Sequence, residues 1–281
     1  MSGSMMPLQG RVAVVTGSSS GIGRAIAVRL ARAGADVVVH ARANRDQAAA
    51  TANEIRALGR ESQLLLADLS AATRLQEFFE QCWNWRGGCD IWINNAGADL
   101  LTTPAKTLPF DDKLELLWRV DVLATIRLSR LAGQRMAERS LTAAPDRAAA
   151  GGAGTDLPVI LNMSWDQVEW GMAGESGELF CAAKGAVAAF TRSLARSLAP
   201  RVRVNCLAPG WIRTKWGETA PEYWRDRACQ ESLLERWGTA EDVAEAALFL
   251  ACPAAAFITG QTLALNGGFR FSGSTPDKGT D

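Results

Sequence analysis

The chain has 281 residues, of which 48% are hydrophobic, and its 30 basic residues balance its 30 acidic residues. This composition predicts one large domain with a substantial buried core. Because the net charge is zero and no basic run occurs, neither nucleic acid nor an anionic membrane surface is expected to bind, which leaves a small molecule as the expected partner.

No apolar stretch approaches the roughly 18 residues that span a bilayer, and no secretory signal is recognisable, so a cytoplasmic protein without a membrane partner is expected. The six cysteines lack Cys-x-x-Cys spacing and the only histidine is His40, which predicts reduced thiols and no metal site. Residues 1–7 are predicted to be an N-terminal tail or a cloning remnant, and the polar residues 271–281 a flexible C-terminal tail.

The first predicted element is a buried strand over the apolar residues 11–16, followed by a glycine-rich turn and an amphipathic helix over 24–33. Gly17 permits the tight turn, Gly21 allows the backbone to approach a pyrophosphate, and Gly23 allows helix and strand to pack closely. The start of the helix offers unpaired N–H groups to a phosphate. Strand, turn and helix thus come in the order that a dinucleotide site requires.

Further short apolar segments alternate with helical periodicity along the chain. They predict strands at residues 37–39, 63–66, 91–94, 159–163, 203–207 and 262–265. Such alternation predicts an α/β fold, with a doubly wound parallel sheet between two layers of helices and ligands beyond the carboxyl ends of the strands. Thr239 is expected to cap a last helix over 243–250, and residues 148–154 are expected to form a surface loop within an insertion at 141–158, to which no function is assigned.

The Gly-x-x-x-Gly-x-Gly spacing of residues 17–23 resembles the short-chain dehydrogenase/reductase superfamily. Further matches lie at Asp68-Leu69, Asn94-Asn95-Ala96-Gly97, residues 203–214 and residues 258–268. The resemblance covers residues 8–270 and implies a single Rossmann-like domain with a substrate lid at about 211–238. It also implies that a nicotinamide dinucleotide contacts Gly17, Ser19, Ser20, Gly21, Ile22, Gly23, Arg42, Asp68, Asn95, Ala96, Gly97, Lys184, Pro209, Gly210, Ile212 and Thr214.

The end of the second strand indicates which dinucleotide is preferred. In the family resembled, NAD-binding members carry an acid there that hydrogen-bonds the ribose hydroxyls; this chain has Ala41, followed by Arg42. The guanidinium of Arg42 suits a 2′-phosphate, and Arg45 or the serines of the glycine turn could add donors. We therefore expect NADP(H) in preference to NAD(H); the alternative is that Arg42 only caps a surface loop.

At the catalytic centre the resemblance implies an Asn, a Ser, a Tyr and a Lys, and only Lys184 is intact. Phe180 falls at the Tyr position, Trp165 at the Ser position with Ser164 one residue early, and Asp121 at the Asn position. A phenyl ring cannot carry a proton, so acid–base catalysis by residue 180 is excluded. Ser164 is a doubtful substitute, because a shift of one residue along a strand turns a side chain to the other face.

Two compensations are conceivable from the sequence. Asp121 is expected to form a buried ion pair with Lys184, unless it lies on a helix surface. Proton transfer could pass to a replacement acid, or be unnecessary for an already cationic substrate such as an iminium ion. The candidate replacements are Asp166, Glu169, Glu178 and, more remotely, Tyr223, although acids of this kind are commonly just solvated loop residues.

Ten tryptophans accompany a single tyrosine. Those of the two segments that wall the substrate side in the family resembled are Trp165, Trp170, Trp211, Trp216 and Trp224. They predict a wide aromatic pocket for a bulky, flat or cationic ligand, unless several pack the lid or a subunit interface.

Two functions remain open from the sequence. The first is an NADP(H)-dependent oxidoreductase with a rearranged proton-transfer site. The second is a dinucleotide-binding pseudoenzyme or non-redox homologue that acts as a structural or regulatory partner. The resemblance also implies a homodimer or homotetramer, formed through the helices that hold Asp121 and Lys184 and through the C-terminal strand.

Overall fold

A computed structural model describes residues 6–102, 104–142, 157–214, 217 and 220–270. The predicted loop at 148–154, the predicted C-terminal tail, most of the predicted N-terminal tail and Trp216 lie outside these residues.

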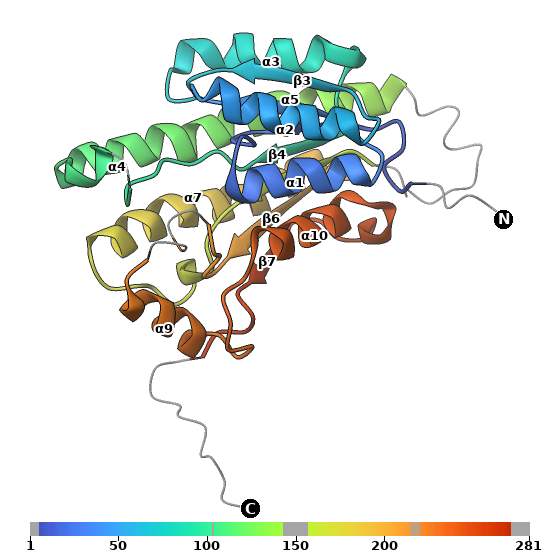
Figure 1. The fold of residues 1–281 in the computed structure, drawn as a ribbon. Coiled ribbons are helices and arrows are strands. Elements are labelled where there is room, and N and C mark those ends of the chain that lie inside the picture. Colours follow the sequence, from blue (N-terminus) through green and yellow to red (C-terminus); the bar gives the residue numbers. More distant parts are fainter. Residues whose placement is uncertain (1–5, 103, 143–156, 215–216, 218–219, 271–281) are drawn as a thin grey trace, which may run out of the picture.

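Seven parallel strands form one sheet in the order β3-β2-β1-β4-β5-β6-β7 (Figure 1). The strands are β1 Val12–Val15, β2 Asp36–Ala41, β3 Ser62–Leu66, β4 Ile91–Asn94, β5 Val159–Met163, β6 Arg203–Pro209 and β7 Thr262–Leu265. The order reverses between β1 and β4, where a doubly wound sheet forms a crevice at its carboxyl edge. The predicted Rossmann-like α/β fold is confirmed.

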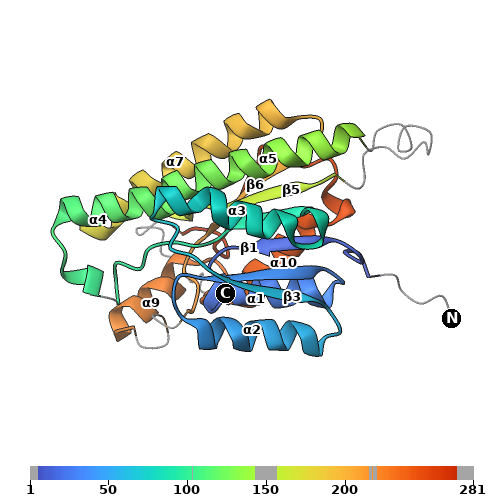
Figure 2. The same cartoon turned by 90° about the horizontal axis from the view of Figure 1, so that it is seen from above.

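Helices cover both faces of the sheet, and Figure 2 shows α1 and α2 on the side opposite α5 and α7. The long helices are α1 Gly21–Arg32, α2 Arg45–Ala57, α3 Leu75–Asn84, α5 Ala124–Thr142, α7 Glu175–Leu198 and α10 Ala240–Ala251. One buried apolar cluster joins α1, α2 and α10 to the sheet, and a second joins α3, α5 and α7 to its other face. Two further helices, α4 Phe110–Leu117 and α9 Glu222–Glu231, lie near the carboxyl edge (Figure 1).

Several predicted boundaries shift in the structure. Helix α1 begins at Gly21 rather than residue 24, because the last residues of the glycine turn already form its first turn. Helix α10 begins at Ala240, and the predicted Thr239 cap is confirmed as a reciprocal capping box: Asp242 N donates to Thr239 Oγ1 at 3.1 Å, and Thr239 N donates to Asp242 Oδ2 at 2.8 Å. Within the described residues, no helix is long and apolar enough to cross a membrane.

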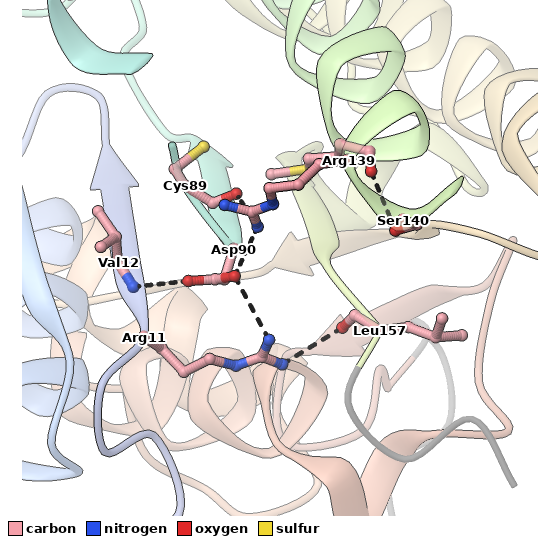
Figure 3. Close-up of polar contacts among 8 residues, drawn as sticks. Arg11, Val12, Cys89, Asp90, Arg139, Ser140 and Leu157 are labelled. Atoms are coloured by element: carbon pink, nitrogen blue, oxygen red, sulfur yellow. Dashed lines mark hydrogen bonds and ion pairs between the residues drawn. The ribbon is translucent and has the colours of Figure 1, made fainter. Parts of the chain in front are cut away.

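The amino edge of the sheet is held by ion pairs around Asp90, shown in Figure 3. Its Oδ1 lies 2.6 Å from Arg139 and 3.5 Å from Arg11, and its Oδ2 accepts a hydrogen bond from Val12 N at 2.9 Å. Arg11 also donates to the carbonyl of Leu157 at 3.5 Å, so the starts of β1, β4 and β5 are tied together. This network lies at the edge opposite the crevice and leaves the carboxyl edge free for ligands.

Candidate active site

The turn between β1 and α1 leaves no room for a side chain at Gly17 or Gly23. Gly17 has a φ of +65°, which favours glycine, and a Cβ added there would lie 2.9 Å from Ala96 Cα. A Cβ on Gly23 would lie 2.3 Å from Gly17 O and 2.4 Å from Asn95 Nδ2. The turn therefore packs tightly against the residues after β4, and Gly17, Ser19 and Ser20 line a cleft, as a pyrophosphate cradle requires.

Residues after β4 lock this turn in place. Thr16 Oγ1 accepts hydrogen bonds from the backbone N–H groups of Asn95 and Ala96, each at 3.0 Å. The Asn95 amide in turn donates to the carbonyls of Thr16 at 3.0 Å and Gly17 at 3.2 Å. The predicted Asn95 therefore acts on the turn itself, and Thr16 is a contributor that the motif alone did not indicate.

His40 is a second contributor that sequence reasoning missed. Its Nδ1 accepts a hydrogen bond from Gly17 N at 3.0 Å and its Nε2 lies 3.0 Å from Ala67 O, which together require the neutral tautomer with the proton on Nε2. The side chain is buried, and desolvation lowers the pKa of His40 from 6.5 to about 4, against smaller opposing effects of Ala67 and Asp68. The imidazole therefore stays neutral near pH 7 and links β2, β3 and the glycine turn.

A cleft runs from this turn to the end of β2. Its walls include eight of the predicted dinucleotide residues: Gly17, Ser19, Ser20, Arg42, Asp68, Asn95, Ala96 and Gly97. Arg42 is exposed, and it lies close enough to Asp68 for its positive charge to stabilise the Asp68 carboxylate. Partial burial opposes ionisation of Asp68, but hydrogen bonds from Ser70 and the charge of Arg42 outweigh it and lower the pKa of this carboxyl.

A second cavity of ≈ 510 Å³, a size typical of small-molecule sites, adjoins the first and shares Asn95, Gly97, Ala98 and Asp99 with it. All five predicted catalytic positions line it: Asp121, Ser164, Trp165, Phe180 and Lys184. So do the remaining predicted dinucleotide contacts Ile22, Pro209, Gly210, Ile212 and Thr214. Gly21 and Gly23 line neither cavity, and Gly23 acts through the close packing described above.

The predicted pair of Asp121 and Lys184 is confirmed. Lys184 Nζ lies 2.7 Å from Asp121 Oδ1, and only 1% of the Asp121 side chain and 12% of the Lys184 side chain are exposed. Asp121 Oδ2 accepts a hydrogen bond from Ala98 N at 2.8 Å, and Lys184 also donates to Met163 O at 3.3 Å. Asp121 belongs to a π-helical turn, Trp118–Leu123, a distortion that is frequent at functional sites and here aims the carboxylate at α7.

The positions predicted for the Ser and Tyr hydroxyls carry an aromatic pair. The rings of Trp165 and Phe180 meet edge to face, with centroids 6.0 Å apart and planes at 70°. Ser164 lines the cavity, but its hydroxyl donates to Lys184 O at 2.9 Å and so supports helix α7. Neither predicted position offers the hydroxyl that would polarise a substrate carbonyl.

The candidate replacement acids lie away from the cavity. Glu169 and Glu178 are exposed, Tyr223 is 65% exposed, and none of the three is among the residues lining either cavity. Asp166 is buried behind Gly210, where Asn266 Nδ2 donates to its Oδ2 at 3.1 Å. Burial raises the pKa of Asp166 to about 6, although the hydrogen bond from Asn266 opposes the rise. Asp166 therefore has a pKa suited to acid catalysis, but it lines neither cavity and so does not meet a substrate.

Tryptophans form much of the wall of the second cavity. Trp165, Trp211 and Trp224 line it as predicted, together with Trp237, which sequence reasoning missed. Trp170 does not line it, because its ring stacks on Phe269 with planes 4° apart. The predicted aromatic pocket is present, with Trp237 in place of Trp170.

Comparisons with known proteins find relatives that match nearly the whole chain. Residues 17–270 match the family model described as enoyl-(acyl carrier protein) reductase. An uncharacterized oxidoreductase of Mycobacterium tuberculosis is 34% identical over 95% of both chains. The 3-oxoacyl-(acyl-carrier-protein) reductase FabG of Aquifex aeolicus is 32% identical over 93% of this chain and 98% of its own.

Solved structures with a similar fold also cover nearly the whole chain. A 3-oxoacyl-(acyl-carrier-protein) reductase from Agrobacterium tumefaciens with NADP bound superposes with a TM-score of 0.79 at 30% identity, over 94% of this chain and 96% of its own. A 7α-hydroxysteroid dehydrogenase in complex with NADH superposes with a TM-score of 0.80 at 28% identity, with the same coverage.

Proposed function

Because this chain belongs to the short-chain dehydrogenase/reductase superfamily, we propose that it is an NADP(H)-dependent oxidoreductase acting on a bulky hydrophobic or aromatic carbonyl, imine or related substrate through a non-standard proton-transfer site. The family model and the relatives described as reductases support an oxidoreductase of the SDR type. The observation that carries the finer proposal is the continuity of two cavities, which share Asn95, Gly97, Ala98 and Asp99 and join a glycine cradle to an aromatic chamber.

The residues present fit a dinucleotide. Gly17 and Gly23 let the turn pack tightly against the residues after β4, and Gly17, Ser19 and Ser20 line the cleft. Lys184 lies at the far end of the path, on the wall of the aromatic chamber. When bound, such a cofactor supplies or accepts hydride. The protein's own contributions are to hold the phosphates at the start of α1, to place Lys184 with Asp121, and to shield the reacting atoms from water with aromatic rings.

Preference for NADP(H) is supported by Arg42 on the cleft wall and Ala41 at the position where an acid would repel a phosphate. Titration with NADPH and NADH tests it. We expect Arg42→Ala to weaken NADPH binding by about 10-fold or more, a typical loss for one charge-assisted contact, and to leave NADH binding unchanged. Arg201→Ala is the matched control, since Arg201 is also exposed but lies before the start of β6, at the edge of the sheet opposite the cleft, and lines neither cavity. Equal losses for both nucleotides in Arg42→Ala would contradict the preference.

The reaction is tested by stopped-flow measurement of NADPH oxidation with panels of ketones, quinones and imines. Turnover with at least one class is expected. The variant Phe180→Tyr with Trp165→Ser should raise the ketone rate, because it restores a proton donor and a hydroxyl at the cavity wall. Acid–base groups contribute roughly 10²- to 10⁴-fold in rate, so a gain of about 10-fold is readily measured.

One observation favours the alternative of a dinucleotide-binding pseudoenzyme. Three of the four positions that carry catalysis in the family resembled hold Phe180, Trp165 and Asp121. NADPH binding without turnover of any substrate class, before and after the double substitution, would establish that alternative.

We also propose a homodimer or homotetramer. Light scattering tests this, since a monomer at micromolar concentration would exclude both oligomers.

A further inference from the structure

We infer that the aromatic cavity recognises a flat organic cation, and that the substrate class of the proposed oxidoreductase is an iminium ion rather than a ketone. The inference rests on the proposed function and deepens it. It follows from the charges on the cavity wall, from its aromatic rings and from the lack of a proton donor at the predicted Ser and Tyr positions.

The floor of the cavity carries no net positive charge. Asp121, buried to 99%, neutralises Lys184 at 2.7 Å. An unpaired ammonium at this depth would repel a cationic ligand and attract an oxyanion, but the ion pair does neither strongly. Among the described residues that line the cavity, the remaining charged side chain is Asp99, at the boundary with the dinucleotide cleft, so acids outnumber bases. The wall therefore tolerates a cation better than an anion.

The walls supply aromatic faces and edges in place of hydroxyl groups. Trp165, Phe180, Trp211, Trp224 and Trp237 surround the space, and aromatic cages of this kind bind organic cations.

Two of these rings already lie beside a cation of the protein. Arg227 lies 5.3 Å from the ring centroid of Trp224 and 5.9 Å from that of Trp211. Glu231 neutralises Arg227 at 2.6 Å and accepts a hydrogen bond from Trp211 Nε1 at 2.7 Å, so this pair adds no net charge beside the cavity.

The chemistry of an iminium ion matches what the site lacks. Its carbon accepts hydride from a reduced nicotinamide dinucleotide, a C–H bond forms, and the π electrons of the C=N bond become the lone pair of a neutral amine. The positive charge passes to the oxidised dinucleotide, so total charge in the cavity is unchanged and no proton is drawn from the protein. A ketone would instead develop an alkoxide beside Trp165 and Phe180, where neither side chain can protonate it.

Binding tests the charge preference without turnover. The full chain, without cofactor, is titrated with N-methylisoquinolinium, a permanent flat cation, and with neutral isoquinoline at pH 8, by calorimetry and by quenching of tryptophan fluorescence. The cation is expected to bind at least ~10-fold more tightly, the scale of a desolvated cation–π contact. Equal affinities, or tighter binding of the neutral ring, would overturn the inference.

Substitutions at the cavity test which residues cause the preference for a cation over a neutral ring. Asp121→Asn exposes the charge of Lys184 and should weaken cation binding about 10-fold while isoquinoline affinity stays within about 2-fold. Asp111→Asn, an exposed carboxylate in the first turn of α4, is the matched control and should change neither. If Asp121→Asn does not fold by circular dichroism, Trp165→Leu serves instead, with a larger loss for the cation than for the neutral ring. Parallel losses for both ligands in the variant used would overturn the inference.

Turnover separates this inference from the proposed function. With NADPH, kcat/KM for N-methyl-3,4-dihydroisoquinolinium should exceed that for 1-tetralone by at least ~100-fold, the lower end of what acid catalysis contributes to a ketone, and should not vary from pH 6 to pH 8. Turnover of the ketone alone refutes the iminium assignment and leaves the oxidoreductase standing. Cation binding with no iminium turnover also refutes iminium as the substrate. Absence of NADPH binding refutes the proposed function itself.

Discussion

The dinucleotide cradle and the aromatic cavity share a wall but depend on different parts of the chain. The cradle is made by backbone groups and by the absence of side chains: Gly17, Gly23 and the amides of Asn95 and Ala96 hold each other in place. The cavity depends on single atoms at the ends of side chains, such as Lys184 Nζ. A backbone site is disrupted by almost any added atom, whereas a side-chain site can be rebuilt for other chemistry while the fold stays intact.

The largest expected effect is on the cradle, from Gly23→Ala. The added Cβ would meet Gly17 O at 2.3 Å, and a backbone carbonyl cannot move without distorting the turn. We expect a loss of more than about 3 kcal/mol in the free energy of unfolding, at the upper end of overpacking costs, and NADPH affinity reduced at least ~100-fold. Chemical denaturation and calorimetry measure the two.

Gly185→Ala is the matched control, because Gly185 also lies within a helix but its nearest neighbour atom would be 3.6 Å away. The free energy of unfolding of Gly185→Ala should stay level or rise by up to about 1 kcal/mol, because alanine has the higher helix propensity. Similar losses in the two variants would mean that close packing at Gly23 is not what makes the cradle.

The next effect belongs to the cavity. Asp121→Ala leaves the Lys184 ammonium without its counter-charge and the Ala98 N–H without its acceptor. Because part of the Lys184 side chain still reaches solvent, we expect a loss of about 3 kcal/mol, at the lower end for a broken buried pair. Asp121→Asn, which keeps an acceptor for Ala98, should lose less than half as much in thermal and chemical unfolding. Equal losses would show that the hydrogen bond to Ala98 adds nothing.

The same division explains what could be predicted from the sequence. Gly17, Gly21 and Gly23 mark the turn because their spacing reflects backbone geometry, and the buried strands follow from apolar runs of four to seven residues. The pair of Asp121 and Lys184 was also predictable, since both positions have a fixed place in the motifs.

The contribution of His40 was not predictable, because it depends on Gly17 and Ala67, which are distant from it in the sequence. For a related reason Trp237 was missed, and it stayed open which of the predicted tryptophans would pack outside the cavity, as Trp170 does. Their positions are set by how the segment containing α9 and the residues after β7 pack, and no periodic pattern in the sequence records that packing.

His40 makes the cradle sensitive to acid. Its pKa of about 4 lies below its ordinary value of 6.5, so between these values the unfolded chain binds more protons and stability falls as pH falls. Unfolding free energy should drop by about 2 kcal/mol from pH 7 to pH 5, because His40 takes up a proton in the unfolded chain. NADPH affinity should hold over this range and fall only near pH 4, where folded His40 is protonated and cannot accept from Gly17 N. In His40→Asn the decline of unfolding free energy with falling pH should flatten; an unchanged decline would assign the acid sensitivity to other groups.

Asp166, buried behind Gly210 in the cavity wall, gives the free energy of unfolding the opposite dependence on pH. Its folded pKa of about 6 lies above its ordinary value of 3.8, so its contribution is most favourable below about pH 4 and is lost as pH rises through 6. Asp166→Asn should therefore stabilise the protein by about 2 kcal/mol at pH 8 and by much less at pH 4. The exposed Asp112→Asn is the control and should be level at both pH values. A destabilised Asp166→Asn at pH 8 would mean that the carboxylate is paired better than its contacts with Asn266 indicate.

The smallest expected effect is a loss of stability that leaves both binding sites unchanged. Thr239→Ala removes the hydroxyl that accepts from Asp242 N and opens the capping box of α10, which costs about 1 kcal/mol in helix caps of this kind. Thr239 lines neither the dinucleotide cleft nor the aromatic cavity, so NADPH and N-methylisoquinolinium affinities should remain within about 2-fold of the native values. Thr239→Ser, which keeps the hydroxyl, should recover most of the stability. If instead Thr239→Ala weakened NADPH binding as strongly as Gly23→Ala, the cradle would depend on the whole helical layer and not on the local packing of the turn.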